Sequence, residues 1–193
     1  MPRVSRVGLI VACVSLLLAA IPRQIVDAAT TDLDNTQARF TAKHLLISTV
    51  QGFIPVKSVQ MSVGANNVPS SVQATLDLTK INTSNDQRDA DLRSDQFFDV
   101  QRFPTMTFSS TQITSQGGSA FVMAGNLNVH GVTKPVTLNG TVGPTIKDSQ
   151  GKTHIGYTAT ATIDRTQWGI GSGYPDAVVG NAISITIAAE VML

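Results

Sequence analysis

Residues 82–110 have the sequence NTSNDQRDADLRSDQFFDVQRFPTMTFSS and differ in kind from the rest of the chain. The first half is polar and densely charged, and the second half contains the four phenylalanines Phe97, Phe98, Phe103 and Phe108. Ser84 or Asn85 can cap the start of a helix, and Pro104 prevents a helix from continuing further. The stretch therefore predicts one short helix, from Asn85 to Phe97, that ends in an aromatic plug.

The segments on either side of this stretch have the patterns of strands. Turn residues separate them, most clearly at Asn66-Asn67, Gly117-Gly118 and His130-Gly131. The predicted strands are Thr36–Lys43, Val50–Val63, Ser71–Leu78, Thr105–Ile113, Ala120–Val129, Pro135–Ile146, Thr153–Ile163 and Ala182–Leu193. Eight antiparallel strands can close as a barrel or stack as a sandwich, and a barrel is favoured because it removes exposed edges. We predict an all-β fold, an eight-stranded antiparallel barrel with the helix inserted between strands 3 and 4.

Small residues lie in the middle of several apolar strand faces: Gly125, Gly140, Ala159, Ala161 and Ala189. In an eight-stranded barrel, such residues can leave room for one ligand. Alternatively, large side chains on facing strands can interdigitate with the small ones and fill the interior. The sequence pattern leaves both readings open.

The N-terminus has the features of a secretory signal. Two arginines precede an apolar run at residues 8–21, and Ala28 is a small residue at a suitable cleavage point. The run is shorter than the roughly 20 residues that a membrane-spanning helix needs. We predict a signal peptide at residues 1–28 and a lipid-binding barrel at residues 29–193, exported to the periplasm or secreted. No stable membrane span is expected after cleavage.

Composition excludes several classes of function. Without the predicted signal the chain keeps 11 basic and 12 acidic residues, so it lacks the basic surplus of a nucleic-acid-binding protein. The one cysteine, Cys13, lies within the signal, so the mature domain can form no disulfide and must rely on its core. The oligomeric state stays open, with a homodimer as one alternative.

The sequence also lacks the motifs of catalysis and metal binding. There are three histidines, and no two of them have the spacing of a metal site. The Gly-x-Ser-x-Gly motif is absent, and the glycine-rich residues 169–173 do not open a helix as a dinucleotide site does. We therefore predict no enzymatic activity, no catalytic residue, no metal and no cofactor. Arg88, Arg93 and Arg165 either fix the helix against the barrel or contact a polar head group.

Four motifs, in order along the chain, resemble those of the YceI family of bacterial periplasmic proteins. They are RDADLRSDQFFD at 88–99, FPTMTFSST at 103–111, GNLNVHGVTKPV at 125–136 and IDRTQWGI at 163–170. In the last motif, Trp168 stands where the family more often has phenylalanine. The resemblance extends from about residue 32 to residue 193, and it implies a lipocalin-like barrel that holds a long isoprenoid chain.

The resemblance makes a carrier the first hypothesis, with a polyisoprenoid, an isoprenoid quinone or a similar long-chain lipid as ligand, for transport, storage or stress response. The alternatives are an enzyme that acts on a lipid or isoprenoid substrate, and a filled barrel that serves as an interaction or stress protein. The residues expected to contact the ligand are Phe40, Phe53, Arg88, Phe97, Phe98, Phe103, Met106, Phe108, Met123, Leu138, Tyr157, Ala159, Ala161 and Trp168.

Overall fold

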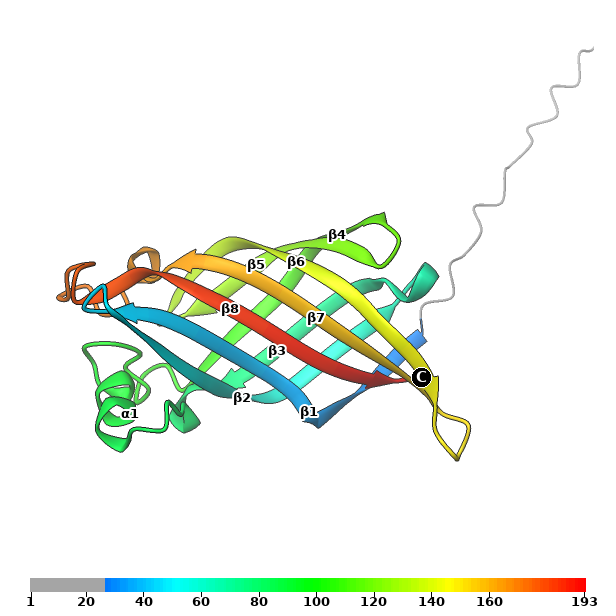
Figure 1. Cartoon of the computed structure of the whole chain (residues 1–193), viewed down its shortest axis with the longest axis horizontal. Coiled ribbons are helices and arrows are strands. Elements are labelled where there is room, and N and C mark those ends of the chain that lie inside the picture. Colours follow the sequence, from blue (N-terminus) through cyan, green and yellow to red (C-terminus); the bar gives the residue numbers. More distant parts are fainter. Residues whose placement is uncertain (1–26) are drawn as a thin grey trace, which may run out of the picture.

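The computed structural model describes residues 27–193, whose strands wind into a barrel (Figure 1). The strands are β1 (Asp27–His44), β2 (Ser48–Val63), β3 (Pro69–Asp77), β4 (Thr105–Gly117), β5 (Ala120–Val129), β6 (Val132–Lys147), β7 (Thr153–Asp164) and β8 (Val179–Met192). Each strand pairs antiparallel with the next, and β1 also pairs with β8, so the sheet closes on itself. The barrel prediction is confirmed and the sandwich is excluded. The predicted signal peptide lies almost entirely outside the described residues.

The helix α1 (Asp86–Arg93) lies between β3 and β4, as predicted, but it is shorter than expected. Its N-cap is Asn85, whose side-chain oxygen accepts a hydrogen bond from the Arg88 backbone N–H. It ends at Ser94, whose N–H and hydroxyl both donate to the Asp91 carbonyl. The residues from Ser94 to Phe103 continue as tight turns rather than as helix, and they carry the aromatic side chains back to β4.

The first strand differs most from its prediction, which began at Thr36. β1 begins at Asp27 and has an irregular pairing register between Ala29 and Gln37. Within this irregularity the Asp32 carboxylate accepts hydrogen bonds from the backbone N–H groups of Asp34 and Asn35. The local turn interrupts the two-residue alternation, and this is why a periodic pattern finds only the second half of the strand.

The turns that separate the strands follow the predicted signals. Asn66, His130 and Gly131 all have positive φ angles, 55°, 52° and 73°, as do Gly117 at the end of β4 and Gly118 after it. Asparagine and glycine tolerate this left-handed conformation better than other residues, so they determine where these hairpins turn. An additional turn, at residues 45–47 between β1 and β2, carries no such signal.

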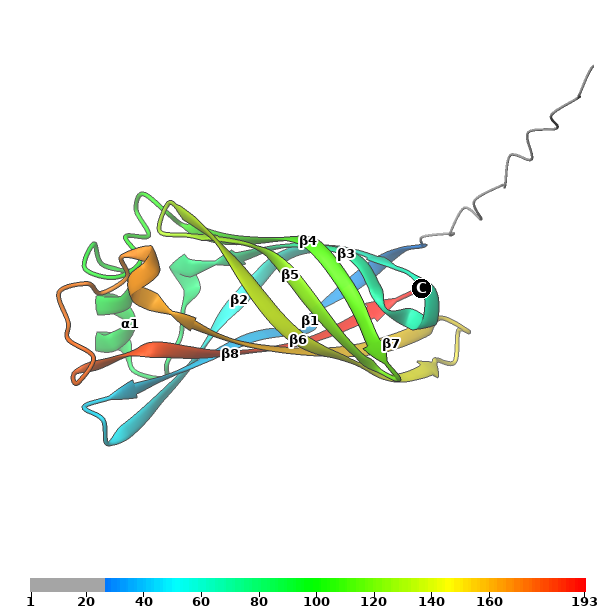
Figure 2. The ribbon, with the colours of Figure 1, turned by 90° about the horizontal axis from the view of Figure 1, so that it is seen from above.

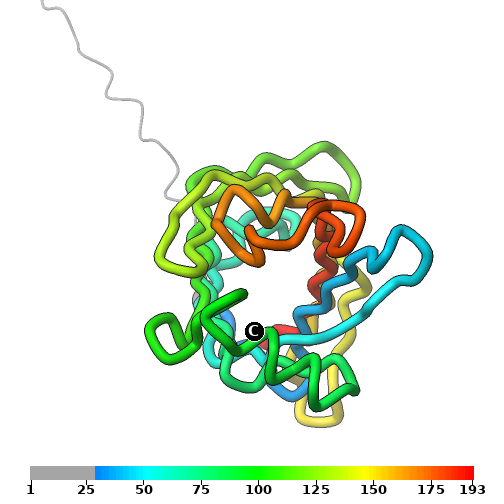
Figure 3. Tube along the Cα trace, turned by 90° about the vertical axis from the view of Figure 1, so that its left-hand side faces the viewer, coloured from blue at the N-terminus to red at the C-terminus, as the bar shows by residue number. Residues whose placement is uncertain are grey.

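Two apolar clusters stabilise the two ends of the barrel. One contains Met61, Val72, Phe121, Ile155 and Val191, and it lies toward the end that holds the C-terminus. The other contains Leu78, Ile81, Phe97, Trp168 and Ile170, and it lies at the end that α1 covers. Figures 2 and 3 show α1 and the segment after β7 together at this second end. The space between the two clusters is the site described next.

Candidate ligand-binding cavity

The interior of the barrel contains a cavity of about 240 Å³. Its wall is almost wholly apolar and receives residues from all eight strands and from α1. The deep wall residues Phe121, Met123 and Leu138 are buried, whereas Ala42, Leu92, Phe98 and Val179 at the α1 end are only half buried. We call the region of these four residues the mouth of the cavity.

The strand glycines do not enlarge this cavity in the way that the sequence suggested. A Cβ atom at Gly140 would lie 2.2 Å from the ring of Phe121, and one at Gly125 would lie 2.4 Å from the ring of Phe108. Each aromatic ring therefore covers a glycine on the neighbouring strand, in an aromatic–glycine pair. This position keeps the ring against the wall and out of the centre of the barrel. Of the five small residues that the sequence singled out, Ala159, Ala161 and Ala189 do face the cavity.

Polar side chains that reach the cavity wall already have protein partners. The Tyr157 hydroxyl donates to the Asn67 carbonyl at 2.7 Å, and its burial raises the pKa of Tyr157 to about 12. Thr36 donates its hydroxyl proton to the Asp32 carbonyl at 2.6 Å. Because these donors are occupied, the deep cavity favours a ligand segment that forms no hydrogen bonds.

Arg165 lines the cavity near its α1 end and is only 2% exposed. All five N–H donors of its guanidinium are used by backbone carbonyls, those of Ile170, Gly171, Tyr174, Val179 and Gly180, at 2.6–3.2 Å. Burial lowers its pKa, and the charge of Asp164 opposes that shift. Arg165 therefore has a structural role, because it holds the loop between β7 and β8 in place. It has no free donor for a polar head group.

Arg88 does not line the cavity, and its side chain makes structural hydrogen bonds at the end of the barrel that α1 covers. Its Nε donates to the Thr83 hydroxyl at 2.8 Å, and the same hydroxyl donates to the buried Asp89 carboxylate at 2.6 Å. Arg93 reaches the Ile81 carbonyl at 3.4 Å. These contacts join α1 to the segment that precedes it.

Phe97 and Phe98 connect this end to the cavity. Both line it, and the Phe97 ring stacks on Tyr174 with centroids 5.1 Å apart. The Tyr174 hydroxyl in turn donates to the Gln96 side chain at 2.7 Å. Phe97 and Phe98 thus join α1 to the loop between β7 and β8 over one end of the barrel. Phe108 lines the cavity from β4, so three of the four phenylalanines of the plug reach the cavity as expected.

Ten of the fourteen predicted ligand residues line the cavity: Phe40, Phe97, Phe98, Met106, Phe108, Met123, Leu138, Tyr157, Ala159 and Ala161. Four do not: Phe53, Arg88, Phe103 and Trp168. Phe103 packs edge-on against His130, with ring centroids 5.2 Å apart. Trp168 is 1% exposed and donates its indole N–H to the Leu127 carbonyl, so its role is in the core.

Phe53 lies on the outer surface with 40% of its area exposed, because of the strand register. Gly52 and Ile54 face the interior, so the residue between them faces outward. A register irregularity between Val56 and Ser58 then moves the inward face to Val59 and Met61. An unbroken alternation through the predicted strand Val50–Val63 would place Phe53 on the same face as Val59 and Met61, so the expectation that Phe53 contacts the ligand is wrong because of this shift.

Sequence reasoning also omitted one wall of the cavity. Ile183, Ile185 and Ile187 on β8 line it, together with Leu92 of α1. The β8 residues alternate clearly in the sequence and could have been included on that ground. Leu92 had no comparable signal, because its position depends on how α1 docks.

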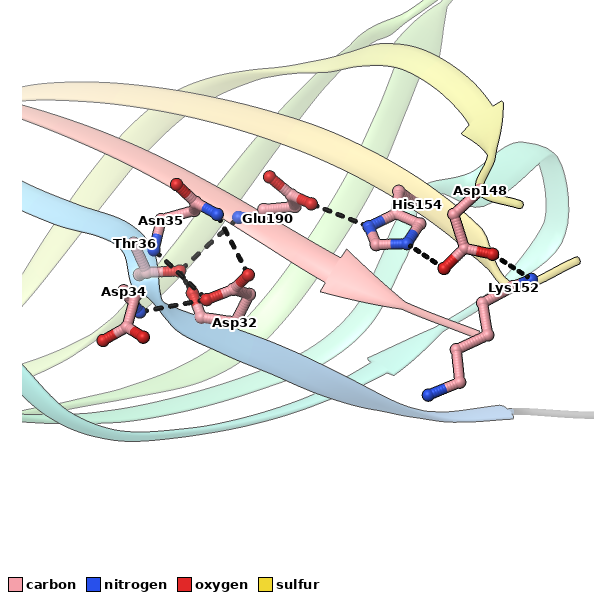
Figure 4. Close-up of polar contacts among 8 residues, drawn as sticks. All are labelled: Asp32, Asp34, Asn35, Thr36, Asp148, Lys152, His154 and Glu190. Carbon is pink, nitrogen blue, oxygen red and sulfur yellow. Dashed lines mark hydrogen bonds and ion pairs between the residues drawn. The ribbon is translucent and has the colours of Figure 1, made fainter. Parts of the chain in front are cut away.

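A polar network occupies the opposite end of the barrel (Figure 4). The His154 Nδ1 lies 2.7 Å from a Glu190 carboxylate oxygen, and its Nε2 lies 3.1 Å from an Asp148 oxygen. Hydrogen bonds to these two carboxylates raise the pKa of His154, and the bond to His154 lowers the pKa of Asp148. Asp32 lies nearby on β1, and hydrogen bonds from Asn35 lower the pKa of its carboxylate. Within residues 27–193, no three metal-binding side chains gather as a metal site requires.

Comparison with known proteins agrees with this architecture. The model of the YceI-like domain matches residues 30–191. The chain belongs to the YceI family. A UPF0312 protein of Vibrio vulnificus strain YJ016 is 30% identical over 132 residues, which cover 68% of this chain and 70% of the relative.

Solved structures with the YceI fold superpose well on this chain. The YceI protein of Campylobacter jejuni has a TM-score of 0.70 at 27% identity and covers 78% of this chain and 89% of its own. BcnA of Burkholderia cenocepacia has a TM-score of 0.75 at 19% identity, over 83% of this chain and 99% of its own. A polyisoprenoid binding domain of Saccharophagus degradans has a TM-score of 0.60 at 13% identity, over 86% of this chain and 98% of its own. No helix in the described part of this YceI protein has the length and apolar character to cross a membrane.

Proposed function

We propose that this protein is a non-enzymatic carrier that holds the chain of a long apolar lipid, such as a polyisoprenoid or an isoprenoid quinone, inside its barrel. The observation that carries the proposal is the cavity, apolar over nearly its whole wall, whose polar neighbours already have protein partners. Removal of apolar surface from water contributes roughly 25 cal/mol per Å² before the costs of binding. A saturated or isoprenoid chain gains this free energy over its whole buried length, and it brings no polar group that would stay unpaired in the cavity.

The name of the Saccharophagus degradans domain supports the same class of ligand, since that domain has the same fold and is described as polyisoprenoid binding. The distribution of polar groups adds a detail about orientation. A head group that needs hydrogen bonds has no unoccupied donor in the deep cavity, so it lies at the mouth beside α1. The proposal places the protein outside the cytoplasm, on the basis of the N-terminal sequence features.

The test is an organic extract of the purified protein, analysed by mass spectrometry. We expect a long-chain apolar lipid in a ratio near one per protein molecule. The matched control is a variant in which Ala159 and Ala161 are both replaced by phenylalanine, which narrows the cavity wall and should lower the lipid yield. If extracts of both proteins contain only background lipid, and neither takes up the apolar dye diphenylhexatriene, the carrier proposal fails and the filled-barrel alternative replaces it.

A further inference from the structure

The turn between β1 and β2 carries large apolar side chains that are exposed to solvent. Leu45, Leu46 and Ile47 are 50%, 66% and 87% exposed. They are three of the seven exposed large apolar residues in the described part of the chain, and they are consecutive. We call these three residues the hairpin tip. Figure 2 shows the tip projecting from the barrel at the end where α1 lies.

The residues of the tip do not suit the turn that they form. Leu45 and Leu46 have φ angles of 51° and 58°, in the left-handed region that asparagine and glycine adopt far more readily than leucine. Other turns of this barrel use such residues, for example Asn66-Asn67 and Gly117-Gly118. Neither turn geometry nor core packing therefore accounts for the leucines, and exposed apolar clusters of this kind mark interaction sites.

The tip is continuous with the mouth of the cavity. The Leu45 N–H donates to the Val178 carbonyl at 3.0 Å, and the adjacent Val179 lines the cavity. On the other side, Ala42 of β1 lines the cavity three residues before the tip. The tip is thus held against the rim of the mouth, within three residues of the apolar lining residue Ala42 and next to Val179.

Charge and size indicate which partner fits. Residues 35–76 contain no aspartate or glutamate, and they contain Arg39, Lys43 and Lys57. Lys43 lies two residues before the tip and is exposed. A basic hairpin with an apolar end complements an anionic lipid surface. Three side chains are too few for a stable protein dimer, which buries about 800 Å² on each partner.

We propose that the hairpin tip inserts into the interface of an anionic lipid bilayer and holds the cavity mouth against it. The inference rests on the proposed function, since a carrier needs a place to load and release its ligand. In this arrangement the lipid chain passes between bilayer and barrel along the path formed by the tip, Ala42 and Val179, with little exposure to water.

The test uses flotation of the purified protein with vesicles of phosphatidylethanolamine and phosphatidylglycerol. We expect the L46S/I47S variant to bind these vesicles at least about tenfold more weakly than the wild type, since it loses most of the apolar insertion. The matched control is Ile146→Ser, which removes a 64% exposed apolar side chain at the opposite end of the barrel and should bind like the wild type. Circular dichroism verifies that all three proteins are folded.

The outcomes separate this inference from the carrier proposal. Diphenylhexatriene uptake in solution reports on the cavity alone and should be unchanged by L46S/I47S. If the wild type takes up the dye but does not float, or if L46S/I47S floats equally well, the docking inference is overturned and the carrier proposal stands. If the wild type floats through its tip but takes up no dye, docking stands and the carrier proposal fails. Concentration-dependent dimerisation that L46S/I47S abolishes, without flotation of the wild type, would assign the tip to a second copy instead.

Discussion

Phe121 and Gly140 are cross-strand neighbours on β5 and β6, and they illustrate how single residues shape the cavity. The ring of Phe121 occupies the space where any larger residue at position 140 would place its Cβ. Phe40 covers Gly52 in the same manner, with a would-be Cβ distance of 2.6 Å. The glycines thus give aromatic rings a place against the wall, and the alanines of β7 leave the centre open.

Replacement of Gly140 by alanine tests the role of this pair. We expect a loss of stability of about 1–3 kcal/mol, because the added methyl group forces the Phe121 ring from its place. The displaced ring has only the cavity to enter, so diphenylhexatriene uptake should fall as well. Chemical denaturation and dye titration measure the two effects.

The matched control is Gly156→Ala on β7, where an added Cβ would meet no atom within 4 Å. That variant should differ from the wild type by less than about 0.5 kcal/mol. Equal effects of the two substitutions would show that glycine propensity, and not the aromatic contact, determines the cost.

At the scale of elements, the two ends of the barrel are stabilised by different means. At the mouth, α1 and the loop after β7 depend on Arg165, on the Thr83–Asp89 hydrogen bonds and on the Phe97–Tyr174 stack. At the opposite end, His154 on β7 links the Glu190 carboxylate of β8 with Asp148 in the β6–β7 turn. The second arrangement depends on charge, so it should respond to pH.

The stabilisation that His154 provides should be lost as pH rises. Its pKa in the folded protein is raised above the ordinary 6.5 by Glu190 and Asp148. Its contribution is therefore complete below pH 6.5 and disappears as pH increases through the folded pKa. Thermal melts of the wild type and of His154→Gln should differ most at about pH 5 and least at about pH 9.

The Asp148 carboxylate determines the lower limit of this window. The pKa of Asp148 is lowered, so it stays ionised until the pH falls below its ordinary 3.8. His44→Gln, on an exposed residue at the other end, is the matched control and should show no such trend. A melting difference for His154→Gln that is constant with pH would mean that the hydrogen bonds, and not the charge, carry the stabilisation.

For the molecule as a whole, the decisive property is whether the interior is hollow or filled. Ala161 lines the cavity from β7 and is partly buried, so the substitution Ala161→Phe adds a ring to the free volume. In a hollow barrel, this variant should lose dye uptake while its stability changes by less than about 1 kcal/mol. In a filled barrel, overpacking should cost about 1–3 kcal/mol.

The neighbouring Thr162 provides the control, since it lies on the same strand with an exposed side chain. Thr162→Phe should change neither dye uptake nor the melting temperature appreciably. Comparison of the two phenylalanine variants therefore distinguishes the effect of filling the cavity from the effect of placing a phenylalanine anywhere on β7.

The order of the elements follows from local signals in this chain. Alternation identifies eight strands, and residues such as Asn66-Asn67 and Gly117-Gly118 determine where most of the hairpins turn, because asparagine and glycine adopt positive φ at lower cost than other residues; the turn at Leu45 and Leu46 is the exception. Asn85 and Ser94 bound the helix through hydrogen bonds to nearby backbone groups. Each of these features depends on residues close in sequence.

The sequence by itself determined the eight strands, the inserted helix and ten of the residues that line the cavity, because alternation assigns one face of each strand to the interior. Tertiary structure decided which way Phe53 faces, because a register shift near Lys57 reverses the alternation between neighbouring stretches of β2. It also decided that Arg165 binds backbone carbonyls and that Phe108 and Phe121 cover glycines. These contacts join residues from different strands and loops, and closure of the barrel is what brings them together.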